Sequence, residues 1–353
     1  MMKEGRAIMN GREIMEIISL GRIPPRIPFV PTIYEHAAKI LNVTPSKMAK
    51  DADLIVDGQI AAYELYRHDM ISVGLDIYNI EAESIGCRVI YYEDDRIPTI
   101  CGTIISSPND LRELMVPEPS KTGRMPLFIE SSRRINEKIG DKVPVCGTIV
   151  GPFTLTAIIR GFENLLMDLI FDEEFAMEQL KFSCNVVLSY AKAFIASGVG
   201  VVINESWIAA PFLSPKLFKE KVFGIEKNLI NQIKAKGLKN VAFICGGNTT
   251  PIYDYLVQTG ASLLMADANT DQRAYKKLCE KYNINLRVSI ESSLVEKGIQ
   301  DEMEEAVVRI IDSCAENGRF IFGCGIVSYN TPPENILKLK MLIEKHNPYK
   351  ALY

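Results

Sequence analysis

Short apolar runs alternate with longer helical patterns along most of this chain. Strands buried on both faces of a parallel sheet are apolar along their whole length, so the runs predict parallel strands separated by helices. Eight runs are predicted as strands, at 27–34, 70–76, 143–151, 199–205, 240–247, 261–267, 285–291 and 319–326. Eight strands, each followed by a helix, predict one closed (β/α)8 barrel, a TIM barrel, that spans residues 1–353.

Helical patterns separate most of these strands, and two further segments fall outside the repeat. The helical patterns lie at 37–66, 110–115, 127–139, 154–161, 173–197, 216–236, 251–259, 272–282, 301–317 and 333–345. A pattern at 11–20 ends before the Pro24-Pro25 pair, whose rings force an extended backbone, and predicts an N-terminal helical extension. At 87–105 residues of β type alternate around a turn, which predicts an inserted β-hairpin that we expect to act as a lid.

The composition excludes several classes of protein. Hydrophobic residues make up 47% of the chain and charged residues 24%, which is typical of a soluble globular protein. A net charge of −4 without a basic run excludes nucleic acid as a main partner. No apolar stretch reaches the roughly 18 residues that span a bilayer and no signal-peptide core is present, so we expect no membrane association and a cytoplasmic location. The eight cysteines, spread along the chain, indicate reduced thiols.

The predicted strand ends carry polar residues that a barrel would bring to one face. These residues are His36, Asp76, Thr148, Asn204, Glu205, Cys245, Asp267, Glu291 and Cys324. Thiols, carboxylates and imidazole are the ligand types of zinc, and a divalent cation would offset the charge of about −3 on two thiolates and a carboxylate in a desolvated site. Cys245 and Cys324 are 79 residues apart (324 − 245), so no local metal motif supports them. The alternative that both are buried structural cysteines stays open.

Near its carboxyl end the chain resembles a known family. Phe-Gly-Cys-Gly-Ile at 322–326, followed by Thr-Pro-Pro-Glu-Asn at 331–335, is similar to the C-terminal signature of the uroporphyrinogen decarboxylase superfamily. Further similar segments lie at 75–77, 81–86, 151–155, 213–215 and 259–261. Members of this superfamily are single barrels, so the resemblance implies the same fold as the strand pattern.

Two branches of this superfamily carry out different chemistry. The decarboxylases have histidine where this chain has Cys324, and arginines in a segment that corresponds to 29–36, where this chain has none, so the resemblance disfavours porphyrinogen decarboxylation. The other branch is of the methylcobalamin:coenzyme M methyltransferase type. Its members bind zinc through a His-x-Cys motif and a distant cysteine. Cys245 and Cys324 match the two cysteines, whereas Phe243 stands at the histidine position. Another side chain must then complete the ligand set, or the metal has been lost.

The resemblance implies a zinc-dependent methyltransferase that moves a methyl group between a corrinoid protein and a small molecule, which is a thiol, a folate or a methoxylated compound. Zn2+ would be held by Cys245, Cys324 and Asp267, with Glu205 and His36 as further candidate ligands. The partner protein would supply the corrinoid. A homodimer is common among proteins that this chain resembles.

The remaining site residues are assigned by their position after the predicted strands. Asp76, Glu205 and Asn204 are the candidate catalytic residues, and Asn248 and Tyr329 are expected to bind the cofactor. Two alternative functions stay open. One is a uroporphyrinogen-decarboxylase-like lyase that acts on a polycarboxylate through Asp76. The other is a non-catalytic barrel that binds a small ligand or a corrinoid partner.

Overall fold

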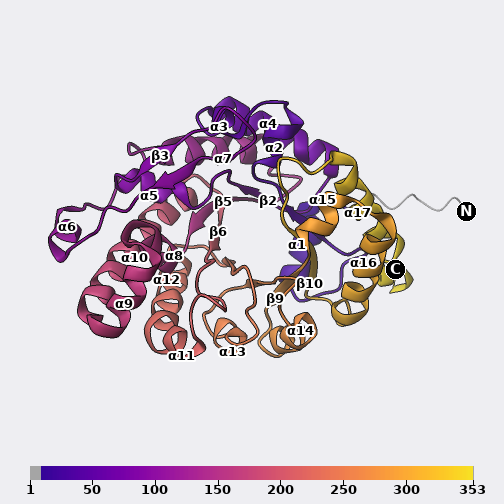
Figure 1. The fold of residues 1–353 in the computed structure, drawn as a ribbon. Coiled ribbons are helices and arrows are strands. Elements are labelled where there is room, and N and C mark those ends of the chain that lie inside the picture. The colour runs from indigo at the N-terminus through magenta and orange to yellow at the C-terminus, as the bar shows by residue number, and fades with distance from the viewer. Residues whose placement is uncertain (1–8, 353) are drawn as a thin grey trace, which may run out of the picture.

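A parallel sheet curls into a barrel with helices around it (Figure 1), in a computed structural model that describes residues 9–352. The strands are β1 Phe29–Thr32, β2 Ile71–Val73, β5 Val145–Val150, β6 Gly200–Asn204, β7 Ala242–Ile244, β8 Leu263–Ala266, β9 Asn285–Ile290 and β10 Phe320–Ile326. They pair in the order β1-β10-β9-β8-β7-β6-β5-β2. The two ends of this order meet where the Asp69 N–H donates to the Phe29 carbonyl, at 2.9 Å. The predicted (β/α)8 barrel and its eight strands are confirmed.

Helices cover the outside of the barrel. They are α1 Gly11–Ser19, α2 His36–Ile40, α3 Pro45–Met48, α4 Ala52–Tyr66, α5 Asn79–Ile85, α6 Pro108–Glu113, α7 Met125–Ile139, α8 Pro152–Arg160, α9 Phe162–Phe171, α10 Glu173–Ala196, α11 Pro215–Leu217, α12 Phe223–Ala235, α13 Tyr253–Leu256, α14 Gln272–Lys281, α15 Ser292–Lys297, α16 Gln300–Cys314 and α17 Pro333–Lys345. A π-helical turn, Phe218–Val222, joins α11 to α12. Within residues 9–352, no helix has both the length and the apolar character needed to cross a bilayer.

The helices differ from the sequence prediction in several places, and α5 and α15 are among the helices that were not expected. The single helix expected at 37–66 is three helices, because Asn42 takes a left-handed backbone at φ 54° and Thr44 then caps α3, while Asp51 takes an extended backbone and caps α4. Helix α9 was not predicted. Its outer face exposes Met167, Ile170 and Phe171, so apolar residues surround the helix and no amphipathic pattern marks it.

Side chains of the strands alternate between the barrel interior and the surrounding helices, and this alternation decides which residues can share a site. The interior holds a small apolar cluster that includes Met70, Val202 and Met265. The outer core, between strands and helices, is much larger and contains Phe243 and Phe322. A polar side chain at an outward-facing strand position is therefore separated from the barrel interior by the sheet itself.

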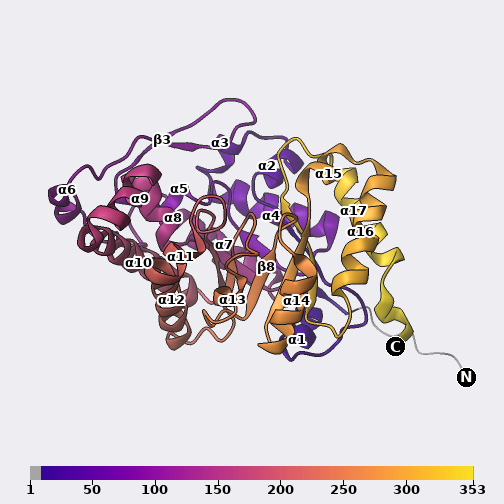
Figure 2. The ribbon, with the colours of Figure 1, turned by 60° about the horizontal axis from the view of Figure 1, so that its bottom comes forward.

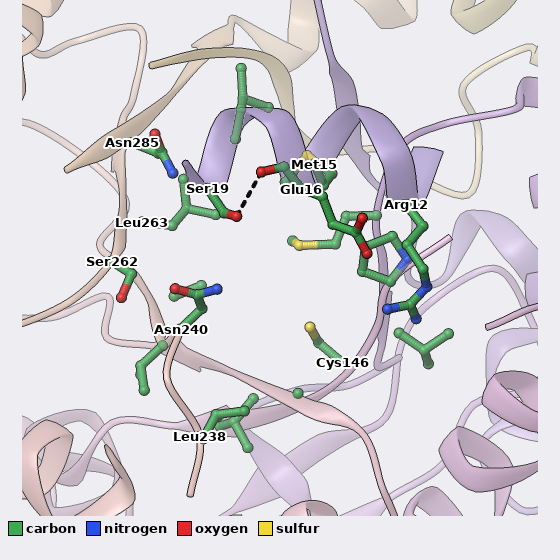
Figure 3. Close-up of a pocket in the computed structure, with 18 of the residues that line it drawn as sticks. Arg12, Met15, Glu16, Ser19, Cys146, Leu238, Asn240, Ser262, Leu263 and Asn285 are labelled. Atoms are coloured by element: carbon green, nitrogen blue, oxygen red, sulfur yellow. Dashed lines mark hydrogen bonds between the residues drawn. The ribbon is translucent and has the colours of Figure 1, made fainter. Parts of the chain in front are cut away.

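The N-terminal extension, confirmed as α1, lies against the amino ends of the strands. Asn10 caps the helix by accepting from the Glu13 N–H at 3.0 Å, while the Glu13 carboxylate accepts from the Asn10 N–H. Between α1 and the strands lies a cavity of about 320 Å³ (Figure 3), which α1 lines with Arg12, Met15 and Glu16. In barrels of this type residues at the amino ends of the strands serve stability, so we look for the functional site at the other end.

The inserted hairpin is also confirmed, as β3 Arg88–Ile90 and β4 Thr99–Cys101 in antiparallel pairing. It lies at the opposite end of the barrel from α1 (Figure 2). The loop between its strands is tied to neighbours on the rim, since Asn330 Nδ2 donates to Asp95 Oδ2 at 2.7 Å and the Tyr92 N–H donates to Ser46 Oγ at 2.8 Å. A lid function for this hairpin stays a prediction.

Candidate active site

A cavity of about 280 Å³ opens at the carboxyl end of the barrel. Side chains from seven strands or the loops that follow them line it, including Tyr34, Asn204, Asp267 and Arg287. Met70 lies at its inner end and also lines the cavity below α1, so an apolar layer separates the two. Small-molecule sites of barrel enzymes lie at this face, which makes the cavity the candidate active site.

Arg287 is the cationic side chain of the cavity. It sits in the middle of β9 and is 5% exposed. One nitrogen, Nη2, donates to the Met265 sulfur at 3.0 Å, while Nε has no partner among the described residues. The side chain crosses over Gly323 of β10, where an added Cβ would lie 2.8 Å from Arg287 Cγ. Glycine at 323 therefore makes room for the guanidinium inside the barrel.

Other polar atoms that point into the barrel also lack partners within residues 9–352. They are Nδ2 of Asn204, which lines the cavity, and Oγ of Ser289, which does not line it, on β6 and β9. The Tyr34 phenol lies nearby, and its burial raises its pKa, while hydrogen bonds with Thr148 and Asn204 and the charge of Arg287 oppose that shift. Buried polar atoms without partners are rare in folded proteins, so this group indicates a site that a ligand or water completes.

Asp267 lies at the mouth of the same cavity, directly after β8. Its carboxylate accepts from the Gly247 N–H at 2.9 Å through Oδ2 and from the Ala268 N–H at 2.9 Å through Oδ1. Two backbone donors fix the carboxylate at the rim of the cavity. The predicted strand-end residues Asp267 and Asn204 are thus brought together around one space.

The two cysteines lie elsewhere. Cys245 and Cys324 are 1% and 0% exposed and pack in the outer core together with Phe243, and neither lines the cavity. Cys245 directly follows β7 and Cys324 lies on β10, and β8 and β9 lie between these two strands in the sheet. Burial raises the pKa of the Cys324 thiol to about 12 and raises that of Cys245 well above its ordinary value. Both thiols are therefore protonated at neutral pH in this environment.

The family resemblance implies zinc, but the expected ligands do not converge. Within residues 9–352, no set of three or more His, Cys, Asp or Glu side chains is placed to hold a metal ion. His36 is occupied by Tyr66 Oη at 2.7 Å and by the Ser328 carbonyl at 3.1 Å, and burial lowers its pKa to about 4. The donor set in this arrangement does not fit a zinc ion, and we derive no step through zinc.

Glu205, a predicted catalytic residue, lies outside the cavity. Its carboxylate accepts from the Phe153 and Thr154 N–H groups at 3.1 and 2.8 Å, and so caps the amino end of α8. Gly151 leaves the space for it, because an added Cβ would overlap Glu205 Oε2. Burial raises the pKa of Glu205 to about 7, and it raises that of the neighbouring Glu226 well above the ordinary value, as does the negative charge of Glu205.

Comparison with known proteins identifies the family. The family model for uroporphyrinogen decarboxylase matches residues 13–346. The chain belongs to the uroporphyrinogen decarboxylase family.

Within this family the chain is similar to proteins named for methyl transfer. A methylcobamide:CoM methyltransferase of Methanosarcina acetivorans is 25% identical over 82% of this chain and 83% of its own length. A methylated-thiol–coenzyme M methyltransferase of Methanosarcina mazei is 27% identical over 94% of this chain and 85% of its own length. The solved structure of a methyltransferase from Methanosarcina mazei has the same fold, with a TM-score of 0.84 at 18% identity over 96% of this chain and 99% of that chain.

Asp76, the other predicted catalytic carboxylate, is held in an ion pair. Arg124 donates to both of its oxygens, at 2.9 and 2.7 Å, and also pairs with Glu83. Burial raises the pKa of Asp76, and the Arg124 charge opposes that shift. Asp76 does not line the cavity. The segment at 75–77, which resembles this family, thus supplies one side of a buried ion pair.

The two predicted cofactor-binding residues lie in loops that follow the cysteine-bearing strands. Asn248 accepts from the Thr250 N–H at 3.1 Å, and the Tyr329 ring lies 5.2 Å from Lys39 Nζ. Neither lines the cavity. Sequence reasoning missed Arg287 because it took the last polar residue of each strand. The available signal was a charged residue inside the otherwise apolar run at 285–291.

Proposed function

We propose that this barrel is a corrinoid-dependent methyltransferase, which moves a methyl group between a corrinoid protein and a small thiol, folate or methoxylated compound. The observation that carries the proposal is the similarity, over most of the chain, to proteins named for methyl transfer to coenzyme M. The cavity supports it, because about 280 Å³ at the carboxyl end of the strands suits a small molecule whose reacting atom faces the mouth.

The transfer needs a nucleophile held in line with a methyl group. In the direction of methylation, a lone pair of the acceptor atom forms the bond to the methyl carbon, the bond from that carbon to the corrinoid breaks with its electron pair left on the corrinoid, and the acceptor loses its proton. The corrinoid supplies or accepts the methyl group when its protein docks over the mouth.

The residues of this chain bind and orient the small molecule. Asn204 and Tyr34 contact it from the side of β6 and β1, and the apolar floor at Met70 keeps water from the inner end of the cavity. Asp267, fixed at the mouth by its two backbone donors, takes the proton of the acceptor.

A lyase that acts on a polycarboxylate is less well supported. Arg287 is the cationic residue in the cavity lining, whereas a ligand with several carboxylates needs several cationic contacts. Asp76, through which such a lyase would act, has both oxygens engaged by Arg124. A non-catalytic barrel would keep the cavity and show no turnover. Zinc, which the sequence predicts, is not part of this proposal, because the donor set does not fit it; a homodimer and a cytoplasmic location remain predictions.

A panel assay tests the proposal. The purified protein is incubated with methylcobalamin and with thiols, folate or methoxyaromatics, and methylated product and corrinoid spectrum are followed together. We expect transfer to or from at least one class. Asn204→Leu, in the cavity, is expected to lower kcat/KM about tenfold, or ~1.4 kcal/mol. The matched variant Asn240→Leu, which lines the cavity at the other end of the barrel, is expected to leave it unchanged. No transfer with any class, with free or protein-bound corrinoid, overturns the proposal.

A further inference from the structure

A second cavity lies at the amino end of the barrel, between α1 and the strands (Figure 3). Its volume is about 320 Å³, compared with about 280 Å³ for the candidate active site. Met70 lines both cavities, and the apolar cluster to which it belongs fills the barrel interior between them. The candidate active site therefore does not account for this second space.

Small residues of the strands leave this space open. Gly198, Gly200 and Ala242 belong to the lining, at or just before the start of β6 and β7. None of these positions carries a side chain larger than a methyl group. An added Cβ at Gly200 would lie 2.7 Å from Cys146 Sγ, so the bare backbone at 200 lets the Cys146 side chain turn into the cavity, as Figure 3 shows.

The cavity opens to solvent between α1 and the loop before β7. Glu16 and Ser19 of α1 and Asn240 of that loop line the cavity and are exposed. The inner wall is apolar, since Leu263 and Ile321 belong to the cluster of the barrel interior. An apolar pocket with a small number of polar groups around it is typical of a small-molecule site.

The charged residues of the lining oppose each other. They are Arg12 and Glu16, which lie one helical turn apart on α1, and Arg12 Nε also donates to the Gly140 carbonyl. Because one side chain is a cation and the other an anion, neither a negative nor a positive ligand gains a net attraction from the pair. The lining therefore favours a neutral ligand.

Two carboxamides supply hydrogen-bonding groups. Asn240 and Asn285 lie across the cavity from Arg12 (Figure 3), and Asn285 Oδ1 is a buried acceptor without a partner within residues 9–352. A carboxamide offers two donor hydrogens and one acceptor oxygen, and a half turn about its Cβ–Cγ bond exchanges their positions. Because buried polar atoms without partners are rare, a ligand that both donates and accepts hydrogen bonds would complete this side of the cavity.

We propose that the cavity at the amino end of the barrel binds a neutral small molecule of about two fused rings that carries an amide-type donor and acceptor on one edge. An apolar cavity of about 150 Å³ is large enough for benzene, so about 320 Å³ has room for two rings. The rings pack on the inner wall at Leu263 and Ile321, and the amide edge pairs with Asn285 and Asn240. This site is separate from the proposed methyl transfer and does not depend on it.

A binding measurement that reports the location of the ligand tests the inference. The probe is 2-quinolinone, a neutral two-ring lactam, and 1-methyl-2-quinolinone is the comparison that lacks the N–H donor. The protein is labelled with carbon-13 at its methionine methyl groups, because Met15 lines the cavity below α1 and Met265 lines the candidate active site. Met15→Leu and Met265→Leu assign the two resonances.

We expect 2-quinolinone to shift the Met15 resonance saturably, with a Kd below about 5 mM, and to leave the Met265 resonance in place. The N-methyl compound is expected to bind at least about tenfold more weakly, because it leaves the Asn285 acceptor without a donor.

Three variants locate the contacts. Asn285→Leu keeps the size of the side chain and removes the amide, so we expect it to weaken 2-quinolinone binding at least about tenfold. Cys146→Phe places a ring in the cavity and is expected to abolish the Met15 shift. Asn204→Leu, the matched change in the candidate active site, is expected to leave binding unchanged. Thermal unfolding without ligand checks the folding of each variant. For Asn285→Leu we expect an unchanged or higher melting temperature, because an unpartnered acceptor is lost.

The comparison of the two lactams needs only the wild-type protein, so the test stays decisive if a variant is poorly folded. A shift of the Met265 resonance in place of that of Met15 overturns the inference, as does the lack of saturable binding up to about 5 mM. Equal affinity of the wild-type protein for the two lactams, or equal affinity of the wild-type protein and Asn285→Leu for 2-quinolinone, also overturns it. Asn285-dependent binding beside Met15 supports the site, with or without methyl transfer.

Discussion

Gly151 leaves the space that the Glu205 carboxylate occupies at the amino end of α8. An alanine at 151 would push this carboxylate away from the Phe153 and Thr154 N–H groups. We expect Gly151→Ala to lower the free energy of unfolding by about 1–3 kcal/mol, measured by urea denaturation. Gly224→Ala is the control, because a Cβ at 224 meets nothing within 4 Å, and there the change is expected to be neutral or stabilising. Equal effects of the two substitutions would contradict the packing described.

Burial raises the pKa of Glu81 from 4.5 to about 8. Between these two pH values Glu81 is protonated in the folded protein and ionised in the unfolded chain. The unfolded state is therefore stabilised relative to the folded state as pH rises, and the free energy of unfolding falls through this window. Glu81→Gln removes this contribution. The difference in unfolding free energy, mutant minus wild type, should therefore rise between about pH 5 and about pH 8. Glu64→Gln, the same substitution at an exposed position, is measured beside it; a flat difference for Glu81→Gln would disprove the assignment.

The Asp76–Arg124 pair can be tested by a double-mutant cycle. Arg124→Gln leaves the buried Asp76 charge uncompensated and is expected to cost about 3–5 kcal/mol. Asp76→Asn is expected to cost less, because Arg124 keeps its pair with Glu83, and the double mutant costs less than the sum. The exposed pair Arg133–Glu130 is the comparison, where Arg133→Gln should cost at most about 1 kcal/mol. Asp76→Asn with wild-type stability but no turnover would instead make Asp76 a catalytic carboxylate.

Metal analysis tests the mismatch between the family resemblance and the donor set. Because Cys245 and Cys324 pack in the outer core and Phe243 supplies no imidazole, we expect protein purified without added zinc to contain less than about 0.2 equivalents, unchanged in Cys245→Ser. A full equivalent of zinc that is lost in Cys245→Ser would show that the loops rearrange around a metal.

The strands could be predicted from the sequence because each is an apolar run bounded by turn residues, and all eight runs are strands. The site could be predicted only in part. Asp267 and Asn204 were found because the carboxyl ends of barrel strands converge. The two cysteines were grouped with them wrongly as cavity residues, since position at a strand end does not reveal which face of the sheet a side chain takes.

Arg287 shows what else the strand-end rule omits. Its backbone lies in the middle of β9, and only the length of its side chain and the glycine at 323 bring the guanidinium into the cavity. Such a contact between two strands depends on their register, here Ser289 opposite Gly323, which a pattern of apolar residues does not encode.

The most direct test of the methyltransferase account follows both sides of the reaction at once. Methylcobalamin and 3-mercaptopropionate are incubated with the protein, and demethylation of the corrinoid is measured by its absorbance while the S-methyl product is measured by mass spectrometry. The account predicts saturable, protein-dependent formation of one thioether for each methylcobalamin consumed. An unchanged corrinoid spectrum and an unmethylated thiol, with free and with protein-bound methylcorrinoid, would contradict it.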